Sequence, residues 1–220
     1  MSSLTSPAHP THPLHQDGSA CDRLRYARGL LRDVVIGSVD HAYPDGMGWS
    51  SVIIASPEPL APVRLAAAWR VGERESKQVQ TTYEQLLLAY HIDAMEKQWP
   101  AHDLGVALSV YLVGNYQMAT DQVLDLDKQR AVVRQLRQRI NRHATLAALT
   151  VLTRQELFEE LAITGTLMSA ILLQNANGIG NDASSWAKPA AQENLQTLLR
   201  LPHTSLYFDQ AGVHVHSGSA

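Results

Sequence analysis

The chain has 220 residues, of which 45% are hydrophobic and 18% charged, and this composition excludes an intrinsically disordered protein and permits a sizeable core. Its formal net charge of -3 excludes a whole-chain field that would recruit nucleic acid or an anionic membrane. The single cysteine, Cys21, excludes an intrachain disulfide and fits a reducing compartment.

Residues 1–20 contain prolines and histidines among small polar residues, and this composition predicts a flexible tail. The tail has neither the basic start nor the apolar stretch of a secretory signal peptide. No segment reaches the roughly 20 apolar residues that cross a bilayer. We therefore expect no membrane insertion and a cytoplasmic location for the chain as written. Removal of an export leader would instead place the protein in the periplasm or outside the cell.

Residues 21–74 predict an irregular N-terminal subregion. Cys21–Arg32 carries leucine and alanine on one side and predicts a short helix. Val34–Val39 and Ser51–Ala55 have the β-branched content of short strands, with a Pro-Asp-Gly turn signal between them. Leu60–Val71 predicts a second short helix.

Residues 75–216 predict a helical core, because apolar residues recur there at spacings of three and four. Thr153 and Glu156 are interpreted as a capping-box pair at the start of one helix. Pro189 is interpreted as a proline in the first turn of the last helix. The five main helices are expected at Ser76–Gln98, Asp103–Thr120, Asp127–Leu149, Arg154–Gln174 and Trp186–Leu201.

The chain ends in a short extended region, where Leu206–Val215 predicts two extended pieces around a turn at Asp209–Gly212. Together, these elements predict a mainly α fold. We expect a single helical-bundle-like domain over residues 21–216, with about five main helices. A small irregular or β-containing N-terminal part and a short extended C-terminus complete it.

Four stretches carry a resemblance to a known family. They are the helix from Asp103 to Tyr116, the Arg-rich helix after it, the stretch Thr153–Asn175 with many small residues, and the ending Leu195–Val215. The ending fits the pattern Leu-x-(Leu/Phe)-x-x-x-Gly-(Val/Leu) at Leu206, Phe208, Gly212 and Val213. Over roughly its last two thirds, the chain resembles an uncharacterised bacterial family of α-helical proteins that share a domain of unknown function. The resemblance implies a helical domain and supplies no catalytic residues.

His91, Glu84 and Asp103 are the candidate residues for acid–base or metal-dependent chemistry, since His91 and Glu84 share a predicted helix and Asp103 begins the next. The structural alternative is a half-buried His91 packed beside Tyr90 and Met95, which is the commoner place for an isolated histidine. The chain has no Cys-x-x-Cys, His-Glu-x-x-His or Gly-x-Ser-x-Gly motif. No cofactor is expected.

His214 and His216 are the candidate metal ligands, because alternate residues of a strand point to the same face. A metal ion needs further ligands that converge on it. The chain terminus beside this pair favours the alternative, in which the two histidines hold no metal.

The candidate binding surface lies on the Arg-rich helix and consists of Arg130, Arg134, Arg137 and Arg142. Guanidinium groups bind phosphate or an acidic protein surface. The structural alternative pairs this helix with Glu156, Glu159 and Glu160 of the next helix, which we expect to be its antiparallel neighbour. No aromatic residues interleave the arginines, so nucleic acid is the least favoured partner.

Ala162, Gly165 and Ser169 place small residues along one side of a predicted helix, where another backbone can approach closely. That backbone is expected to belong to the same domain, with a homodimer as the alternative. Because packing explains the predicted helices, the sequence favours a non-enzymatic accessory or protein-interaction protein, such as an immunity or adaptor protein. The alternative is a hydrolase or metal-dependent enzyme built on His91, Glu84 and Asp103.

Overall fold

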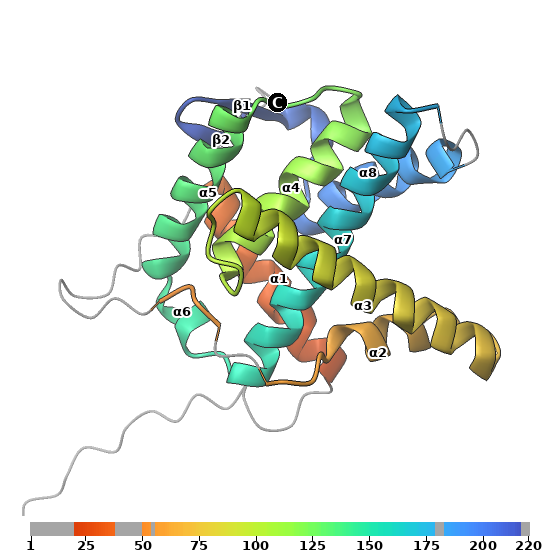
Figure 1. Cartoon of the computed structure of the whole chain (residues 1–220). Coiled ribbons are helices and arrows are strands. Elements are labelled where there is room, and N and C mark those ends of the chain that lie inside the picture. The colour runs from red at the N-terminus through yellow and green to blue at the C-terminus, as the bar shows by residue number, and fades with distance from the viewer. Residues whose placement is uncertain (1–19, 38–49, 54–55, 179–182, 217–220) are drawn as a thin grey trace, which may run out of the picture.

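The computed structural model describes residues 20–37, 50–53, 56–178 and 183–216 (Figure 1). The Pro-Asp-Gly turn signal lies outside these residues, as does the expected tail except for Ala20. The last two residues of each expected N-terminal strand, 38–39 and 54–55, also lie outside them. The described elements, in chain order, are α1 Ala20–Ile36, α2 Ala61–Ala67, α3 Glu73–Glu96, α4 Leu104–Thr120, α5 Leu126–Asn141, α6 Ala144–Ala147, α7 Val151–Ala176, α8 Ala183–Leu199, a 3-10 turn His203–Ser205, β1 Leu206–Asp209 and β2 Gly212–Val215.

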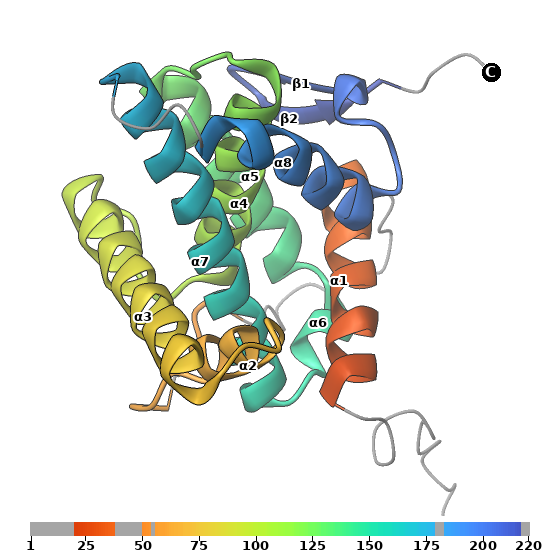
Figure 2. The same ribbon diagram turned by 90° about the vertical axis from the view of Figure 1, so that its right-hand side faces the viewer.

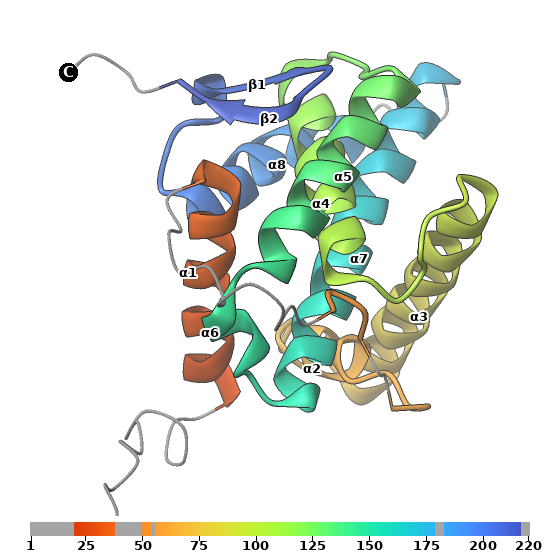
Figure 3. The same ribbon diagram turned by 90° about the vertical axis from the view of Figure 1, so that its left-hand side faces the viewer.

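The helix α4 is the centre of the fold. Every residue from Leu104 to Ala119 except Val110 is buried, so the helix is surrounded on all sides, as expected for a helix without a polar face. Its most extensive neighbour is α7, and α5 and α8 flank it. Figures 2 and 3 show α3 and α1 on opposite sides of this group, with the β1–β2 hairpin at one end.

The close crossing of α4 and α7 depends on two glycines. A methyl group added at Gly165 would lie 2.6 Å from the backbone nitrogen of Tyr111, and one added at Gly114 would overlap the carbonyl oxygen of Gly165. Neither position therefore accepts a larger side chain without separating the helices. This contact confirms the expectation that the backbone next to the small residues of α7 belongs to the same chain, since it is the backbone of α4.

Asp103 caps α4 and links it to α5. Its carboxylate is fully buried and accepts hydrogen bonds from the backbone N–H groups of Gly105 and Val106 at 2.8 and 3.1 Å. The other carboxylate oxygen accepts a hydrogen bond from Ser51 Oγ at 2.6 Å and pairs with Arg137 Nε at 2.9 Å. These four contacts give a buried charge the partners that it needs.

The remaining backbone contacts of this region fix the segment 50–53 against the start of α4. Ile53 N–H donates to the carbonyl of His102 at 2.7 Å, and Leu104 N–H donates to the carbonyl of Ser51 at 2.9 Å. Val52 and Asp103 form an isolated antiparallel bridge. The strand predicted at Ser51–Ala55 is therefore wrong for its described residues, which pair with a helix start and not with another strand.

The expected strand at Val34–Val39 is also wrong where the structure describes it. Val34 and Val35 lie in the last turn of α1, and Arg139 Nη1 donates to their carbonyl oxygens at 3.1 and 2.7 Å. This guanidinium satisfies carbonyls that a helix end leaves free. Burial lowers the pKa of Arg139. The β-branched residues here lie on the buried face of a helix. Over a short apolar stretch, periodicity does not distinguish such a helix from a strand.

The predicted pairing of the Arg-rich helix with the glutamates of α7 is wrong. Glu160 pairs with Arg28 of α1 and with Arg64 of α2, and Glu156 also pairs with Arg64. Glu159 accepts hydrogen bonds from the N–H groups of Leu60 and Ala61, at 2.7 and 2.8 Å, where α2 begins. The glutamates therefore attach α1 and α2 to α7.

Three helix boundaries also differ from the prediction. The helix expected at Asp127–Leu149 breaks at Arg142 and His143, and His143 Nδ1 accepts the Leu146 N–H to cap α6. The cap of α7 is Thr150, whose Oγ1 accepts the Thr153 N–H at 3.2 Å. The predicted capping box of Thr153 and Glu156 is therefore wrong, because Thr153 lies inside the first turn of the helix. Pro189 lies in the second turn of α8, because that helix begins at Ala183.

The mainly α prediction and the extended C-terminus are confirmed. β1 and β2 pair antiparallel, with Leu206 opposite Val215 and Asp209 opposite Gly212, as the predicted turn requires. The short helix after residue 60 is confirmed as α2. Among the residues that the structure describes, none of the helices combines the length and apolar character that crossing a membrane requires.

We expect Gly165→Ala to lower the free energy of unfolding by about 1–3 kcal/mol, because the added methyl group forces α4 and α7 apart. Gly29→Ala is the matched control, since nothing lies within 4 Å of a methyl group at that position. The control should stabilise α1 by about 0.5–1 kcal/mol. Urea unfolding of both variants measures the difference, and equal stability of the two would contradict the proposed crossing.

We expect Asp103→Ala to lower the free energy of unfolding by about 2–4 kcal/mol, because it removes a helix cap and leaves buried donors without a partner. Asp125 caps α5 through the Lys128 N–H at 2.8 Å but is exposed, and Asp125→Ala should therefore cost less. Thermal unfolding of both variants compares the two caps. An equal or greater loss for Asp125→Ala would show that the buried network around Asp103 adds nothing.

Candidate functional site

The structure does not assemble the expected catalytic residues. Glu84 is exposed and accepts a hydrogen bond from Gln80 Nε2 at 2.8 Å. His91 lies seven residues further along α3, which is a rise of about 10 Å. Asp103 is buried and engaged as the cap of α4. In the described part of the chain, no hydrogen bond or ion pair joins any two of these three.

His91 instead belongs to a cluster of rings beneath α3. Its ring centroid lies 4.7 Å from that of His102, 5.5 Å from that of Tyr90 and 6.2 Å from that of Phe158. Burial, and then the charge of His102, lower the pKa of His91. Burial, followed by the charge of Asp103, raises the pKa of Tyr90. Both shifts favour the neutral forms of the two side chains. The described residues offer no hydrogen-bond partner to His91 Nε2 or the Tyr90 hydroxyl.

The candidate arginine surface is divided by the structure. Arg137 pairs with buried Asp103, and Arg130 pairs with Asp127 of its own helix at 3.3 Å. Arg134 and Arg142 are exposed. Arg130 is exposed as well, so three of the four side chains face solvent, while Arg137 has a structural contact that competes with any outside partner.

His214 and His216 do lie on one side of the C-terminal hairpin. The rings of both stack on Tyr207, with centroid distances of 4.8 and 4.2 Å, and His214 Nε2 lies 2.9 Å from Asp209 Oδ1. Hydrogen bonds from the Ala211 N–H and from His214 lower the pKa of Asp209. Nowhere among the described residues do three metal-ligating side chains of the His, Cys, Asp and Glu types gather into a site.

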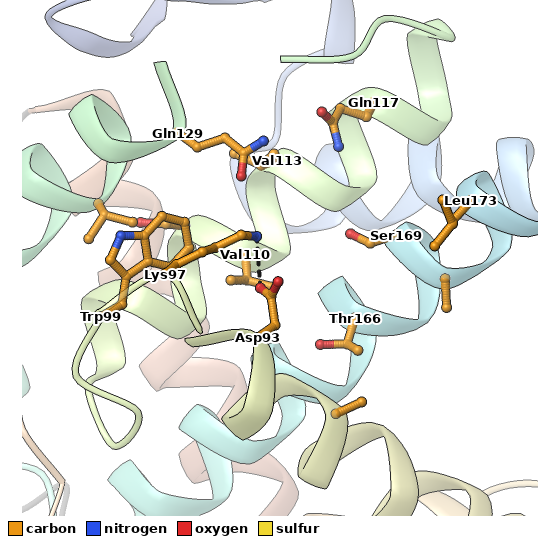
Figure 4. Close-up of a pocket in the computed structure, with 14 residues that line it drawn as sticks. Asp93, Lys97, Trp99, Val110, Val113, Gln117, Gln129, Thr166, Ser169 and Leu173 are labelled. Atoms are coloured by element: carbon orange, nitrogen blue, oxygen red, sulfur yellow. Dashed lines mark hydrogen bonds and ion pairs between the residues drawn. The ribbon is translucent and has the colours of Figure 1, made fainter. Parts of the chain in front are cut away.

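A cleft of about 300 Å³ opens beside the last turns of α3, between this helix, α4 and α7 (Figure 4). Its size is at the lower end of the range for small-molecule sites, which is about 300–1,000 Å³. The lining residues come from α3 and the turn after it, α4, α5 and α7: Ala89, Asp93, Lys97, Trp99, Ser109, Val110, Val113, Gln117, Gln129, Val133, Thr166, Ser169, Ala170 and Leu173.

Two glutamines form one end of this cleft by fixing the loop between α4 and α5. Gln117 Oε1 accepts the Leu124 N–H at 2.7 Å, and Gln129 Nε2 donates to the Leu124 carbonyl at 2.9 Å. Because the N–H donor must meet an oxygen, these contacts fix the orientation of both amides. The free ends of both side chains face the cleft in Figure 4.

A charge pair and an indole form the rim. Lys97 Nζ lies 2.8 Å from Asp93 Oδ2 and 5.0 Å from the centroid of the Trp99 ring. Asp93 and Lys97 are the two charged side chains among the lining residues, and each offsets the other. The interior of the cleft is therefore apolar with uncharged polar groups.

The opposite flank of α3 carries an exposed apolar row. Leu88, Ile92 and Met95 are 59%, 50% and 71% exposed, whereas Leu87, Tyr90 and Ala94 of the same helix are buried. In the sequence, Tyr83, Leu86, Leu87, Tyr90 and Met95 recur at helical spacings, and this pattern predicted a buried Met95 and did not include Leu88 or Ile92. The signal was present, because the second half of α3 is apolar around most of its circumference and one helix face cannot bury all of it.

We expect the stability of the protein to decrease as pH falls below about 6.5, because the unfolded chain protonates His91 at a higher pH than the folded chain does. The loss should continue until the pH reaches the lowered pKa of folded His91. Urea unfolding at several pH values, compared with His91→Phe, isolates this contribution. A loss of the same size in the variant would contradict it, as would an NMR titration midpoint of His91 above 6.5.

Comparison with known proteins gives one family. Neither a curated protein nor a solved structure matches the chain. The model of a family of unknown function, DUF6683, matches residues 55–216, which include α2 to α8 and the C-terminal hairpin. The match confirms the expected resemblance to a domain of unknown function. Since it covers well over half of the residues, the chain belongs to the family of unknown function DUF6683.

Proposed function

We propose that the protein is a non-enzymatic interaction protein of a bacterium, and that its partner docks an amphipathic helix on the outer flank of α3. The observation that carries this proposal is the exposed row of Leu88, Ile92 and Met95. Contiguous apolar surface on a chain in water marks interaction sites more often than isolated exposed leucines do. Burial of this row by a partner would contribute about 25 cal/mol for each Å² of apolar surface covered.

The spacing of the row fits a helical partner. Its members are four and three residues apart, which is the spacing of the seam between two packed helices. Such a seam receives the apolar side chains of one face of an amphipathic helix. The row is short, so the contact should be specific and of modest strength.

Charges at the two ends of the row indicate the chemistry of the partner. Glu84 and Glu96 are exposed on either side of the apolar residues. A partner helix with lysine or arginine beside its apolar face would neutralise them. A second copy of this chain would instead bring two further glutamates to the same contact. A basic amphipathic helix is therefore favoured over a homodimer.

The arginine surface supports the proposal less strongly. Arg134 and Arg142 can meet an acidic partner, but Arg137 already pairs with Asp103, and Arg139 holds the end of α1. Nucleic acid remains the least favoured partner.

An immunity or adaptor role for a bacterial effector, in the cytoplasm, is one form of this proposal. No observation favours the enzyme alternative, because Glu84, His91 and Asp103 do not meet.

We expect the protein with p-benzoylphenylalanine in place of Ile92 to form a photocrosslink to one partner protein in its own cells. The same replacement at exposed Arg134 is the control, since it tests the arginine surface. Mass spectrometry of the adducts identifies the crosslinked peptide, which should be a helix with basic residues beside an apolar face. A crosslink at position 134 and none at position 92 would overturn the choice of surface. An adduct of two copies of this chain would establish the homodimer instead.

We further expect Glu84→Lys combined with Glu96→Lys to weaken binding of the identified partner about tenfold or more, through like-charge repulsion. The fold should be unchanged, because both side chains are exposed. Calorimetric titration at two salt concentrations measures the effect. Unchanged affinity at low salt would contradict a basic partner.

A further inference from the structure

We propose that the cleft between α3, α4 and α7 binds a small molecule with a short aliphatic body and an uncharged amide or hydroxyl head. This site is separate from the outer flank of α3, since its lining residues do not include Leu88, Ile92 or Met95. The proposal therefore goes beyond a protein partner, and either can fail without the other.

The cleft is a formed site because its walls are held in place. The crossing at Gly114 and Gly165 fixes α4 against α7, and the two bonds to Leu124 fix the loop that closes one end. Small side chains, including Ser109, Thr166, Ser169 and Ala170, leave the space open between the helices. The volume of about 300 Å³ thus lies between elements whose backbones are fixed against one another.

Gln117 is the group that indicates a polar ligand atom. Its side chain is 7% exposed, and its Oε1 is engaged by the Leu124 N–H. Its Nε2 has no hydrogen-bond acceptor among the described residues, and Figure 4 shows it directed into the cleft. This Nε2 is not among the fully buried side-chain atoms that lack a partner, so it is open to the space of the cleft. A ligand carbonyl or hydroxyl oxygen placed there would accept its N–H in place of water.

The acceptors needed by a ligand N–H or O–H lie nearby. Gln129 uses its Nε2 on the Leu124 carbonyl, which leaves its Oε1 as an acceptor at the same end of the cleft. The Thr166 hydroxyl lies on the α7 wall and can donate or accept (Figure 4). A primary amide matches this set, since it has a carbonyl oxygen for Gln117 and an N–H for Gln129.

The remaining lining residues determine which hydrocarbon body and which charge a ligand of the cleft can have. Val110, Val113, Val133, Ala170 and Leu173 present aliphatic surface. Asp93 and Lys97 neutralise each other at 2.8 Å, so the cleft offers no unpaired charge to a carboxylate or an ammonium group. A charged head would lose its hydration without an opposite charge to replace it. The cleft therefore selects an uncharged amphipathic molecule.

The test uses three small molecules that share an eight-carbon skeleton and differ in the head group, namely octanamide, octanoate and octylammonium. We expect octanamide to bind at one saturable site and at least about tenfold more tightly than either ion. Isothermal titration calorimetry with the full chain gives the affinities, and amide NMR shifts locate the site at α3, α4 and α7. Failure of octanamide to saturate at millimolar concentration would overturn the proposal, as would equal binding of the ions.

Two variants make the assignment specific. Ala170→Leu fills the cleft and should lower octanamide affinity about tenfold or more, whereas Ala67→Leu, on the exposed end of α2, should leave it unchanged. Thr166→Val keeps the shape but removes the hydroxyl, and should cost about fivefold. Unfolding curves confirm that the variants fold. Octanamide affinity that is unchanged in Ala170→Leu would overturn the site.

Discussion

The contact between the backbones of α4 and α7 is the constraint on which the rest of the structure depends. Gly114 and Gly165 permit this contact, and any side chain at either position would separate the helices. With α7 so close, α4 loses its access to water, and α5 and α8 cover its remaining sides. α3 packs on α7 and on α2 and stays at the outside of the bundle. The crossing thus gives α3 two free flanks, one over the cleft and one facing solvent.

Charged groups attach the peripheral elements to this pair, and two arginines of the basic helix, Arg137 and Arg139, take part in these structural contacts. Arg137 pairs with Asp103 because the buried carboxylate needs a cation. Arg139 donates hydrogen bonds to the end of α1. Arg28 pairs with Glu160, and Arg64 pairs with Glu156. Among the described residues, the apolar outer flank of α3 is a surface that these structural charge pairs do not use.

The sequence predicted the elements of this fold better than their contacts. The helix from Asp103 was predictable because a capping aspartate precedes a long apolar segment, and the C-terminal hairpin because its turn is marked by Asp209 and Gly212. The pairing of Glu160 with Arg28 and Arg64 was not predictable, since it depends on which helices become neighbours in space. The cleft could not be predicted either, because Gln117, Lys97 and Thr166 come from three segments that are far apart in the sequence. Met95 was misplaced because helical spacing alone does not identify the buried face when apolar residues surround a helix.

Amide hydrogen exchange followed by mass spectrometry tests the central claim most directly, namely that a rigid α4–α7 pair supports a peripheral α3. Local opening is governed by buried contacts, so exchange should rank the helices by their burial. The account predicts that α4 and the middle of α7 exchange only through global unfolding, while the second half of α3 exchanges well before them. Slow exchange of α3 at the rate of α4 would contradict this account, as would rapid exchange around Gly114 and Gly165.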